Sequence, residues 1–105
     1  MAWIYLFIAG LLEVTWATCL KLSEGLTRLN WSAATIVGMI LSFIFLSQAT
    51  KTLPLGTAYG IWTGIGALGA VLVGILLFKE PTSAPRLFFA ALLLAGIVGL
   101  KITSP

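Results

Sequence analysis

Glu13 is the carboxylate in this sequence that has the most unusual surroundings, because long apolar stretches lie on both sides of it. It lies in AGLLEVTWAT, residues 9–18, and Trp16 follows it by about one helical turn. In a membrane-crossing helix that begins near Trp3, Glu13 would lie about 15 Å deep, close to the bilayer midplane. A charge at that depth costs at least about 2.5 kcal/mol, and Lys21 lies about 12 Å further along the helix, too far to pair with it. We therefore interpret Glu13 as a functional residue.

Small and aromatic residues share the predicted helical face of Glu13. Gly10 and Trp16 lie within one turn of it on either side, which predicts the wall of a shallow pocket. Ser42 is the polar residue near the middle of the second apolar stretch, at a similar depth. Its hydroxyl can donate to the Glu13 carboxylate or to the backbone carbonyl four residues before it, and the sequence leaves both alternatives open.

The third apolar stretch presents a second set of candidate pocket residues. Tyr59, Trp62, Thr63 and Gly66 fall on one helical face. Trp62 is also close enough to the membrane surface to belong to the interfacial aromatic belt, but its company favours the pocket. Gly64 and Gly66 flank a single isoleucine, so we expect the helix to bend at this point.

A deep carboxylate beside aromatic rings is suited to an organic cation. Guanidinium is planar and permanently charged, donates hydrogen bonds in the fork geometry that a carboxylate accepts, and stacks on indole or phenol rings. A bulkier quaternary ammonium ion would use the same acid and rings without hydrogen bonds. Because Glu13 must lose its proton to bind a cation, proton and substrate would compete for one site, and this competition predicts proton-coupled exchange.

The composition places these residues in a membrane. Hydrophobic residues make up 60% of the 105-residue chain and charged residues only 9%, with a mean hydropathy of +1.12. A chain of this length has too little interior to bury so much apolar surface. We therefore predict an integral membrane protein whose apolar surface contacts lipid.

Four apolar segments are long enough to cross the hydrocarbon core as helices. They cover residues 3–20, 31–49, 58–78 and 87–102, separated by loops such as TKTLPLG and KEPTSAPR. All of these loops are short, so consecutive helices should be antiparallel neighbours. The fold class is therefore an all-α membrane protein, with residues 1–105 forming a single four-helix transmembrane domain.

The loop charges favour neither orientation in the membrane. One side would carry the amino terminus, Lys51 and Lys101. The other side would carry four basic residues, two of which have an acidic neighbour: Lys21, Arg28, Lys79 and Arg86. Four short helices can hardly enclose a ligand-sized cavity, and the chain has no internal repeat. Two copies inserted in opposite orientations would supply the second half, so we expect a dual-topology homodimer.

Several other classes of function are excluded or disfavoured. Cys19 is the one cysteine and there is no histidine, so we expect no metal site and no cofactor. The basic residues are scattered singly, which argues against nucleic acid as a partner. The fourth segment carries Ala91, Ala95 and Gly99 as a ridge of small residues, which predicts close helix packing, and we expect this packing to be in the dimer.

Several segments together resemble the small multidrug resistance transporters, and within them the guanidinium exporter subtype: EVTWATCLK, SEGLTRL, TKTLPLGTAYGIWTGIGALGA and GIVGLK. The resemblance covers the whole chain. It implies a transporter and not an enzyme, built as an antiparallel homodimer of four-helix chains in the bacterial inner membrane. It also implies the export of guanidinium or singly substituted guanidinyl cations in exchange for protons.

Carried onto matching positions, the resemblance makes Glu13 the shared site of proton and substrate. It assigns a helix bend to residues 64–66. It assigns hydrogen-bonding and stacking roles around the site to Trp16, Ser42, Tyr59 and Trp62. Trp16 fits the guanidinium subtype, because the multidrug branch typically has a small residue there. Gly60 departs from the alanine common in the family, which bears on the width of the pocket.

Three alternative functions stay open at this point. The first is a multidrug exporter of quaternary ammonium and other lipophilic cations. The second is a passive cation channel, although the predicted helices carry few polar residues at mid-depth for a continuous polar path. The third is a structural or accessory membrane subunit, which would explain the glycines but not Glu13. Transport against a gradient separates an exchanger from the last two.

Overall fold

The computed structural model describes residues 1–104, and this part of the chain consists of four helices and their connections, without a strand. The helices are α1 (Ala2–Leu22), α2 (Leu29–Ala49), α3 (Leu55–Phe78) and α4 (Ala84–Ile102). All four are long and apolar enough to cross a membrane. Helices satisfy their backbone hydrogen bonds internally, which is the requirement for a chain segment in lipid. The architecture is that of an all-helical, multi-pass membrane protein.

All four helices begin before the predicted residue, and α3 and α4 begin three residues early, beside prolines. α3 starts at Leu55, directly after Pro54, and therefore includes Gly56, which we expected to interrupt the helix. α4 starts at Ala84 and has Pro85 in its first turn. The first turn of a helix needs no backbone donor, so proline is tolerated there and its fixed φ favours the start of a helix.

The connection between α1 and α2 is a tight reversal organised by a buried serine. Ser23 Oγ donates a hydrogen bond to the Leu20 carbonyl (2.6 Å) and accepts one from the Leu26 backbone N–H (3.0 Å). The next three residues, Glu24, Gly25 and Leu26, all have positive φ values of 51°, 76° and 67°. Only glycine adopts this conformation freely, so Gly25 at its centre lowers the strain of the turn.

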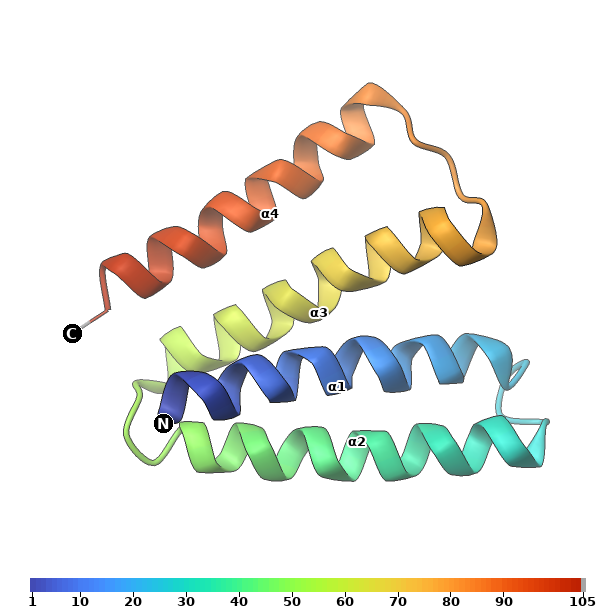
Figure 1. Ribbon diagram of the computed structural model, residues 1–105, viewed down its shortest axis with the longest axis horizontal. Helices are drawn as coiled ribbons and strands as arrows, with labels where there is room; N and C mark the ends of the chain where they lie inside the picture. The colour runs from blue at the N-terminus through green and yellow to red at the C-terminus, as the bar shows by residue number, and fades with distance from the viewer. Residues whose placement is uncertain (105) are drawn as a thin grey trace.

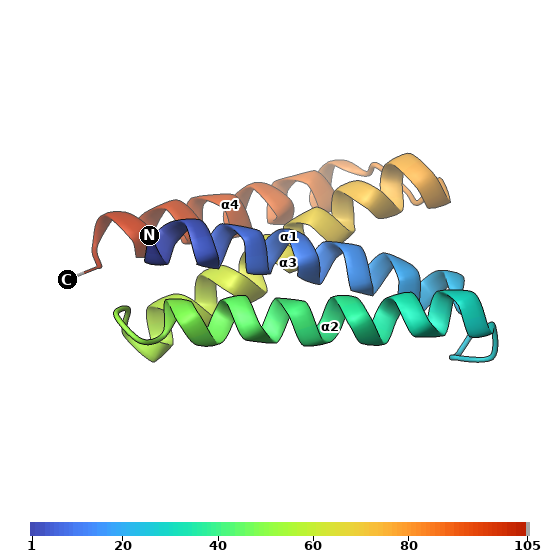
Figure 2. The same cartoon turned by 60° about the horizontal axis from the view of Figure 1, so that its bottom comes forward.

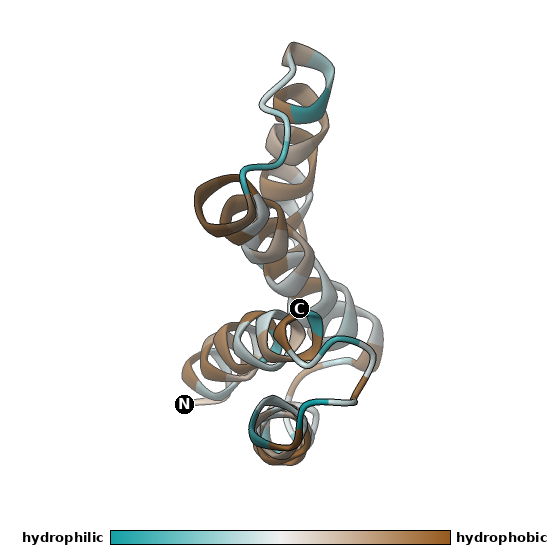
Figure 3. Cartoon of the chain, turned by 90° about the vertical axis from the view of Figure 1, so that its right-hand side faces the viewer, coloured by the Kyte–Doolittle hydropathy of each residue, from teal (hydrophilic) through white to brown (hydrophobic). Residues whose placement is uncertain are grey.

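The helices are arranged as a flat row and not as a closed bundle. α1 packs against both α2 and α3, whereas the backbone of α4 lies close to α3 alone within the described residues (Figures 1 and 2). The shortest dimension of the backbone is 16 Å, against 42 Å and 34 Å for the other two. Hydrophilic residues gather mainly at the loops and helix ends, and the lengths of the helices are predominantly apolar (Figure 3). A single chain therefore leaves most of its helical surface open to lipid or to another protein.

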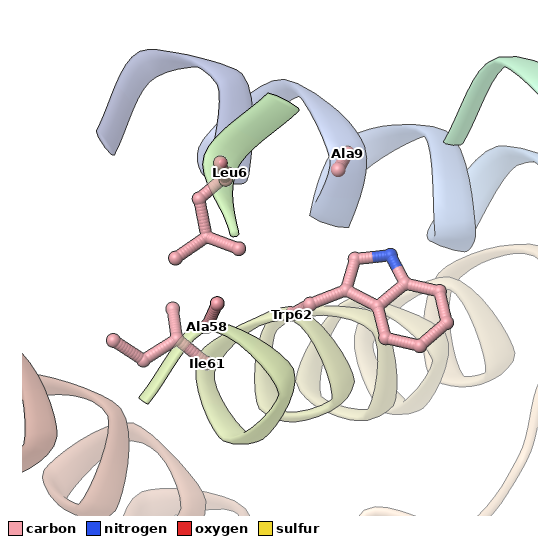
Figure 4. Packing of buried hydrophobic residues seen from close by; sticks show 6 residues of the cluster. Leu6, Ala9, Ala58, Ile61 and Trp62 are labelled. Atoms are coloured by element: carbon pink, nitrogen blue, oxygen red, sulfur yellow. The ribbon is translucent and has the colours of Figure 1, made fainter. Parts of the chain in front are cut away.

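The buried core is small and lies where α1, α2 and α3 meet. Its members are residues of these three helices: Leu6, Ala9, Ala49, Ala58, Ile61 and Trp62. Leu6 and Ala9 of α1 face Ala58, Ile61 and Trp62 of α3 (Figure 4). Three of the six are alanines, which lets the helix backbones approach closely.

Glycines in the middle of α3 face two different neighbouring helices. A Cβ on Gly64 would lie 2.8 Å from Ile97 Cγ1, and one on Gly60 would lie 3.1 Å from Leu100 Cδ1, so these two glycines accommodate α4. Gly66, in contrast, faces α1. The small-residue pattern therefore serves two interfaces on opposite sides of one helix.

Candidate functional site

Glu13 lies in the middle of α1, against the backbone of α3. A Cβ on Gly66 would overlap the Glu13 carboxylate, so the acid occupies the space that any side chain at position 66 would fill. The two helices are held at this distance by similar contacts one turn to either side. A Cβ on Gly10 would lie 2.6 Å from Ile65 Cγ2, and one on Gly69 would overlap Val14. Glycine at these positions is what lets the acid reach the α3 backbone.

The Glu13 carboxylate has no ion pair among residues 1–104. The other two acidic residues of the chain each contact an arginine: Glu24 lies 3.5 Å from Arg28, and Glu80 is paired with Arg86. Glu13 Oε1 is buried and has no hydrogen-bond partner in the described part of the chain. A buried carboxylate oxygen without a donor is costly, and a cationic ligand or a proton would satisfy it.

Trp16 is the second polar group of α1 whose bonding capacity is unused. Its indole Nε1 is buried and makes no hydrogen bond within residues 1–104. Its Cβ packs closely on α2, 3.0 Å from where a Cβ of Gly38 would lie. Glu13 and Trp16 thus place one acceptor and one donor about one turn apart on the same helix, both without a partner.

Ser42 joins α1, α2 and α3 through two buried hydrogen bonds. Its hydroxyl donates to the Ala9 carbonyl (2.7 Å) and accepts from Trp62 Nε1 (3.0 Å). We had considered the Glu13 carboxylate and the serine's own helix as acceptors, but the structure directs the single hydroxyl proton to Ala9 instead. In an α-helix the carbonyl of Ala9 also accepts the backbone N–H of Glu13, so Ser42 fixes the turn that carries the acid.

The aromatic residues of α3 form a cluster beside this hydrogen-bond network. Trp62 is 6% exposed, whereas Tyr59 is 54% exposed, and their ring centroids are 5.4 Å apart. Phe43 of α2 meets the other side of the Trp62 ring edge-on at 5.8 Å. The cluster therefore runs from the buried network out to the surface of the chain.

The remaining predicted pocket residues are more dispersed. Gly10 is buried beneath Ile65 and does not line open space, and Thr63 is exposed on α3. Gly64 faces α4 and Gly66 faces Glu13, and α3 continues through both as an uninterrupted helix. The helix bend at these glycines stays a prediction.

Sequence reasoning missed three contributors to the site. The Ala9 carbonyl is a backbone group and leaves no trace in residue type, and Phe43 is one of many apolar residues in α2. Gly38 did leave a signal, because it is the one glycine in α2 and a large aromatic residue packs on it. An isolated glycine in a transmembrane segment favours a close helix contact.

Comparisons with known proteins agree with this architecture. A family model described as "Small Multidrug Resistance protein" matches residues 1–93. The chain is 56% identical over 104 residues to a protein of Salmonella typhimurium strain LT2 named "Guanidinium exporter", covering 99% of both chains. It is similarly related to proteins of the same name from Citrobacter freundii (56%, 99% of both chains) and Yersinia pseudotuberculosis (54%, 99% of this chain and 100% of the other). These names are those of transporters. The chain belongs to the small multidrug resistance protein family.

Proposed function

We propose that this protein exports guanidinium and singly substituted guanidinyl cations in exchange for protons, with both ligands competing for Glu13. The observation that carries the proposal is the buried Glu13 carboxylate oxygen without a donor, in the middle of a membrane-crossing helix. Full-length relatives named guanidinium exporter, at 54–56% identity, support the choice of substrate.

The chemistry of the substrate matches the unused bonding capacity at the site. A guanidinium ion is all donor, with five or more N–H groups in a plane, and a carboxylate accepts two of them side by side. Burial of Glu13 makes the paired state favourable, because a charge in an apolar setting needs an opposite charge. Trp16 and Tyr59 supply aromatic faces on which a planar cation stacks.

Competition at one carboxylate is sufficient to couple the two fluxes. When Glu13 is protonated it is neutral and has no charge with which to retain a cation, and when a cation is bound the proton has been released. An exchanger that changes orientation only with one ligand bound then moves substrate outward as protons move inward. No second titratable group is needed in this scheme.

We further propose that the working unit is an antiparallel homodimer in the bacterial inner membrane. Support comes from the flat row of helices, from the exposed Tyr59 beside a buried network, and from loop charges that favour neither orientation. A second copy in the opposite orientation would cover these surfaces and close the site around a ligand. The two copies of Glu13 would then share one chamber and titrate as a coupled pair.

The decisive experiment measures guanidinium flux in proteoliposomes with and without a pH gradient. An exchanger accumulates guanidinium against its own gradient when the gradient of protons drives it. A passive channel equilibrates guanidinium and never concentrates it, and a structural subunit shows no flux above protein-free liposomes. A quaternary ammonium ion tested in parallel separates the guanidinium exporter from a multidrug exporter, since the latter would accumulate both.

A further inference from the structure

An apolar groove lies between α1, α3 and the second half of α4. Its volume is about 510 Å³, and side chains such as Phe7, Leu11, Leu68 and Leu94 line it. The groove exists because the backbone of α4 lies close to α3 but not to α1, so that α1 and α4 form walls with α3 between them. We call it the α1/α3/α4 groove. Glu13, Trp16, Ser42 and Trp62 do not line it.

The length of this groove corresponds to one leaflet of a bilayer. Along α1 its lining runs from Trp3 to Val14, which is about 16 Å of helical rise. Along α3 the lining runs from Ile61 to Val73, which is about 18 Å of rise. The hydrocarbon core is about 30 Å thick, so a groove of this length covers about half of it. A transmembrane helix of a second copy would cross both leaflets, whereas a lipid acyl chain occupies one.

A cation and an indole lie at the surface end of the groove. Lys101 in the last turn of α4 places its Nζ 5.2 Å from the centre of the Trp3 ring, and both residues line the groove. The amino terminus and the α2–α3 connection, which carries Lys51, lie at the same end of the molecule (Figure 1). The α1–α2 and α3–α4 connections, which carry the acids Glu24 and Glu80, lie at the other end. Within the described residues, the surface end of the groove is therefore purely cationic.

We propose that the α1/α3/α4 groove binds one acyl chain of a phospholipid whose anionic headgroup is held by Lys101. An interfacial belt accounts for a tryptophan and a lysine at helix ends taken one at a time. It does not account for their stacking on each other directly above an apolar groove of one-leaflet length. Basic residues beside transmembrane helices are a recurrent way to bind anionic headgroups.

The test compares two lipids with the same acyl chains, phosphatidylglycerol and phosphatidylcholine, offered to the purified full-length protein. Native mass spectrometry of the protein as it assembles counts the lipids that remain bound. The charge variant is Lys101→Gln, with Lys51→Gln as the control at the same end of the molecule. The groove variant is Leu72→Trp, which fills the inner part of the groove, and its control is Leu76→Trp, one turn further along the same helix and outside the groove.

We expect the wild-type protein to retain phosphatidylglycerol in preference to phosphatidylcholine. Lys101→Gln should lower this preference about fivefold, which corresponds to about 1 kcal/mol, and Lys51→Gln should leave it unchanged. Leu72→Trp should reduce the retention of both lipids, and Leu76→Trp should not. Equal effects of the two lysine variants would overturn the proposal. So would a Leu72→Trp protein that loses its assembly and keeps its lipid, because the groove would then belong to a second copy. If Leu72→Trp does not fold, the lysine pair still decides.

Discussion

The first and last helices of this chain are similar in length and apolar character, yet they are packed very differently. α1 has neighbours on two sides, and its contacts are specific: glycines on α2 and α3 receive its side chains, and Ser42 bonds its backbone. Within residues 1–104, the backbone of α4 lies close to α3 alone, and α4 contains no buried residue. We infer that α1 is positioned by its own chain for ligand binding, and that the surface of α4 is completed from outside the chain by lipid or a second copy.

The largest effect on the ligand-binding role of α1 is expected from a substitution of Glu13. Glu13→Gln should abolish proton-driven guanidinium accumulation, because an amide neither titrates nor pairs with a cation. In the unaltered protein, guanidinium affinity should fall as the pH falls, by up to about tenfold per pH unit, since protonation removes the negative charge; in Glu13→Gln it should be flat. Binding titrations over a range of pH and liposome flux measure both, and Glu24→Gln in the exposed loop is the matched control. A Glu13→Gln protein that still accumulates guanidinium would place proton coupling elsewhere.

The proposal that an oppositely oriented second copy packs on α4 can be tested by measuring the orientation of the chains in the membrane. We expect tags at either terminus to be accessible on both sides of sealed vesicles, because the loop charges favour neither orientation. Extra lysines in the loops of one side should then force a single orientation and eliminate activity. Co-expression with an oppositely biased copy should restore it. Fully one-sided labelling of the unaltered protein would contradict the antiparallel arrangement.

Two glycine substitutions sharpen the contrast between the helix faces. Gly66→Ala should reduce guanidinium transport about tenfold or more, because the added methyl overlaps the Glu13 carboxylate and overpacking costs about 1–3 kcal/mol. Gly96→Ala on α4 adds the same methyl at a position where no atom of another helix lies within 4 Å in the described part of the chain, so transport should change less than about twofold. Initial rates in liposomes provide the comparison, with detergent-solubilised yield as a check on folding. Equal losses of transport would mean that α4 is packed as tightly around Gly96 as α3 is packed against α1 around Gly66.

Trp16 decides whether the α1 face binds ligand or only packs. Trp16→Gly removes a buried indole N–H and an aromatic surface, so guanidinium affinity should fall about tenfold while bulkier quaternary ammonium ions gain entry. Trp31→Phe at the exposed start of α2 is the control and should alter neither. Competition binding with guanidinium and a quaternary ammonium ion measures the shift. Retained guanidinium affinity without any new substrate would make Trp16 a packing residue.

The smallest effect is expected at Ser42. Ser42→Ala leaves Trp62 Nε1 without its acceptor, which should lower the free energy of unfolding by about 1–3 kcal/mol and weaken substrate binding severalfold. Ser47→Ala, exposed on the same helix, should change neither. Thermal unfolding in detergent and binding titrations test this pair. An unchanged Ser42→Ala protein would show that α1 is positioned by its glycine contacts alone.

The sequence alone was sufficient to predict the features that depend only on the residues within a single helix. The four spans follow from apolar length, and Glu13 stands out because an acid at mid-depth is costly anywhere in a membrane helix. α3 and α4 begin earlier than predicted, because proline acts at these positions as a helix initiator and not as a helix breaker.

The contacts between helices were beyond sequence reasoning. Gly64 and Gly66 are separated by one residue, yet one faces α4 and the other faces Glu13, and only the rotation of α3 against its neighbours determines which. The acceptor of the Ser42 proton is a backbone carbonyl on another helix, for which residue type gives no signal. The periodicity of a sequence shows which residues share a face of a helix, but it does not show which neighbouring helix that face contacts.

α1 begins and α4 ends on the same side of the molecule, and this constrains how the protein can evolve (Figure 1). When such a gene is duplicated and fused in frame, a short linker joins two ends on one side of the membrane, and both halves insert the same way up. An inverted pair within one polypeptide would require an odd number of added or deleted crossings. Two separately translated chains avoid that requirement, so gene duplication without fusion, followed by opposite drift of the lysines and arginines in the two copies, is the most direct route from this protein to a heterodimer.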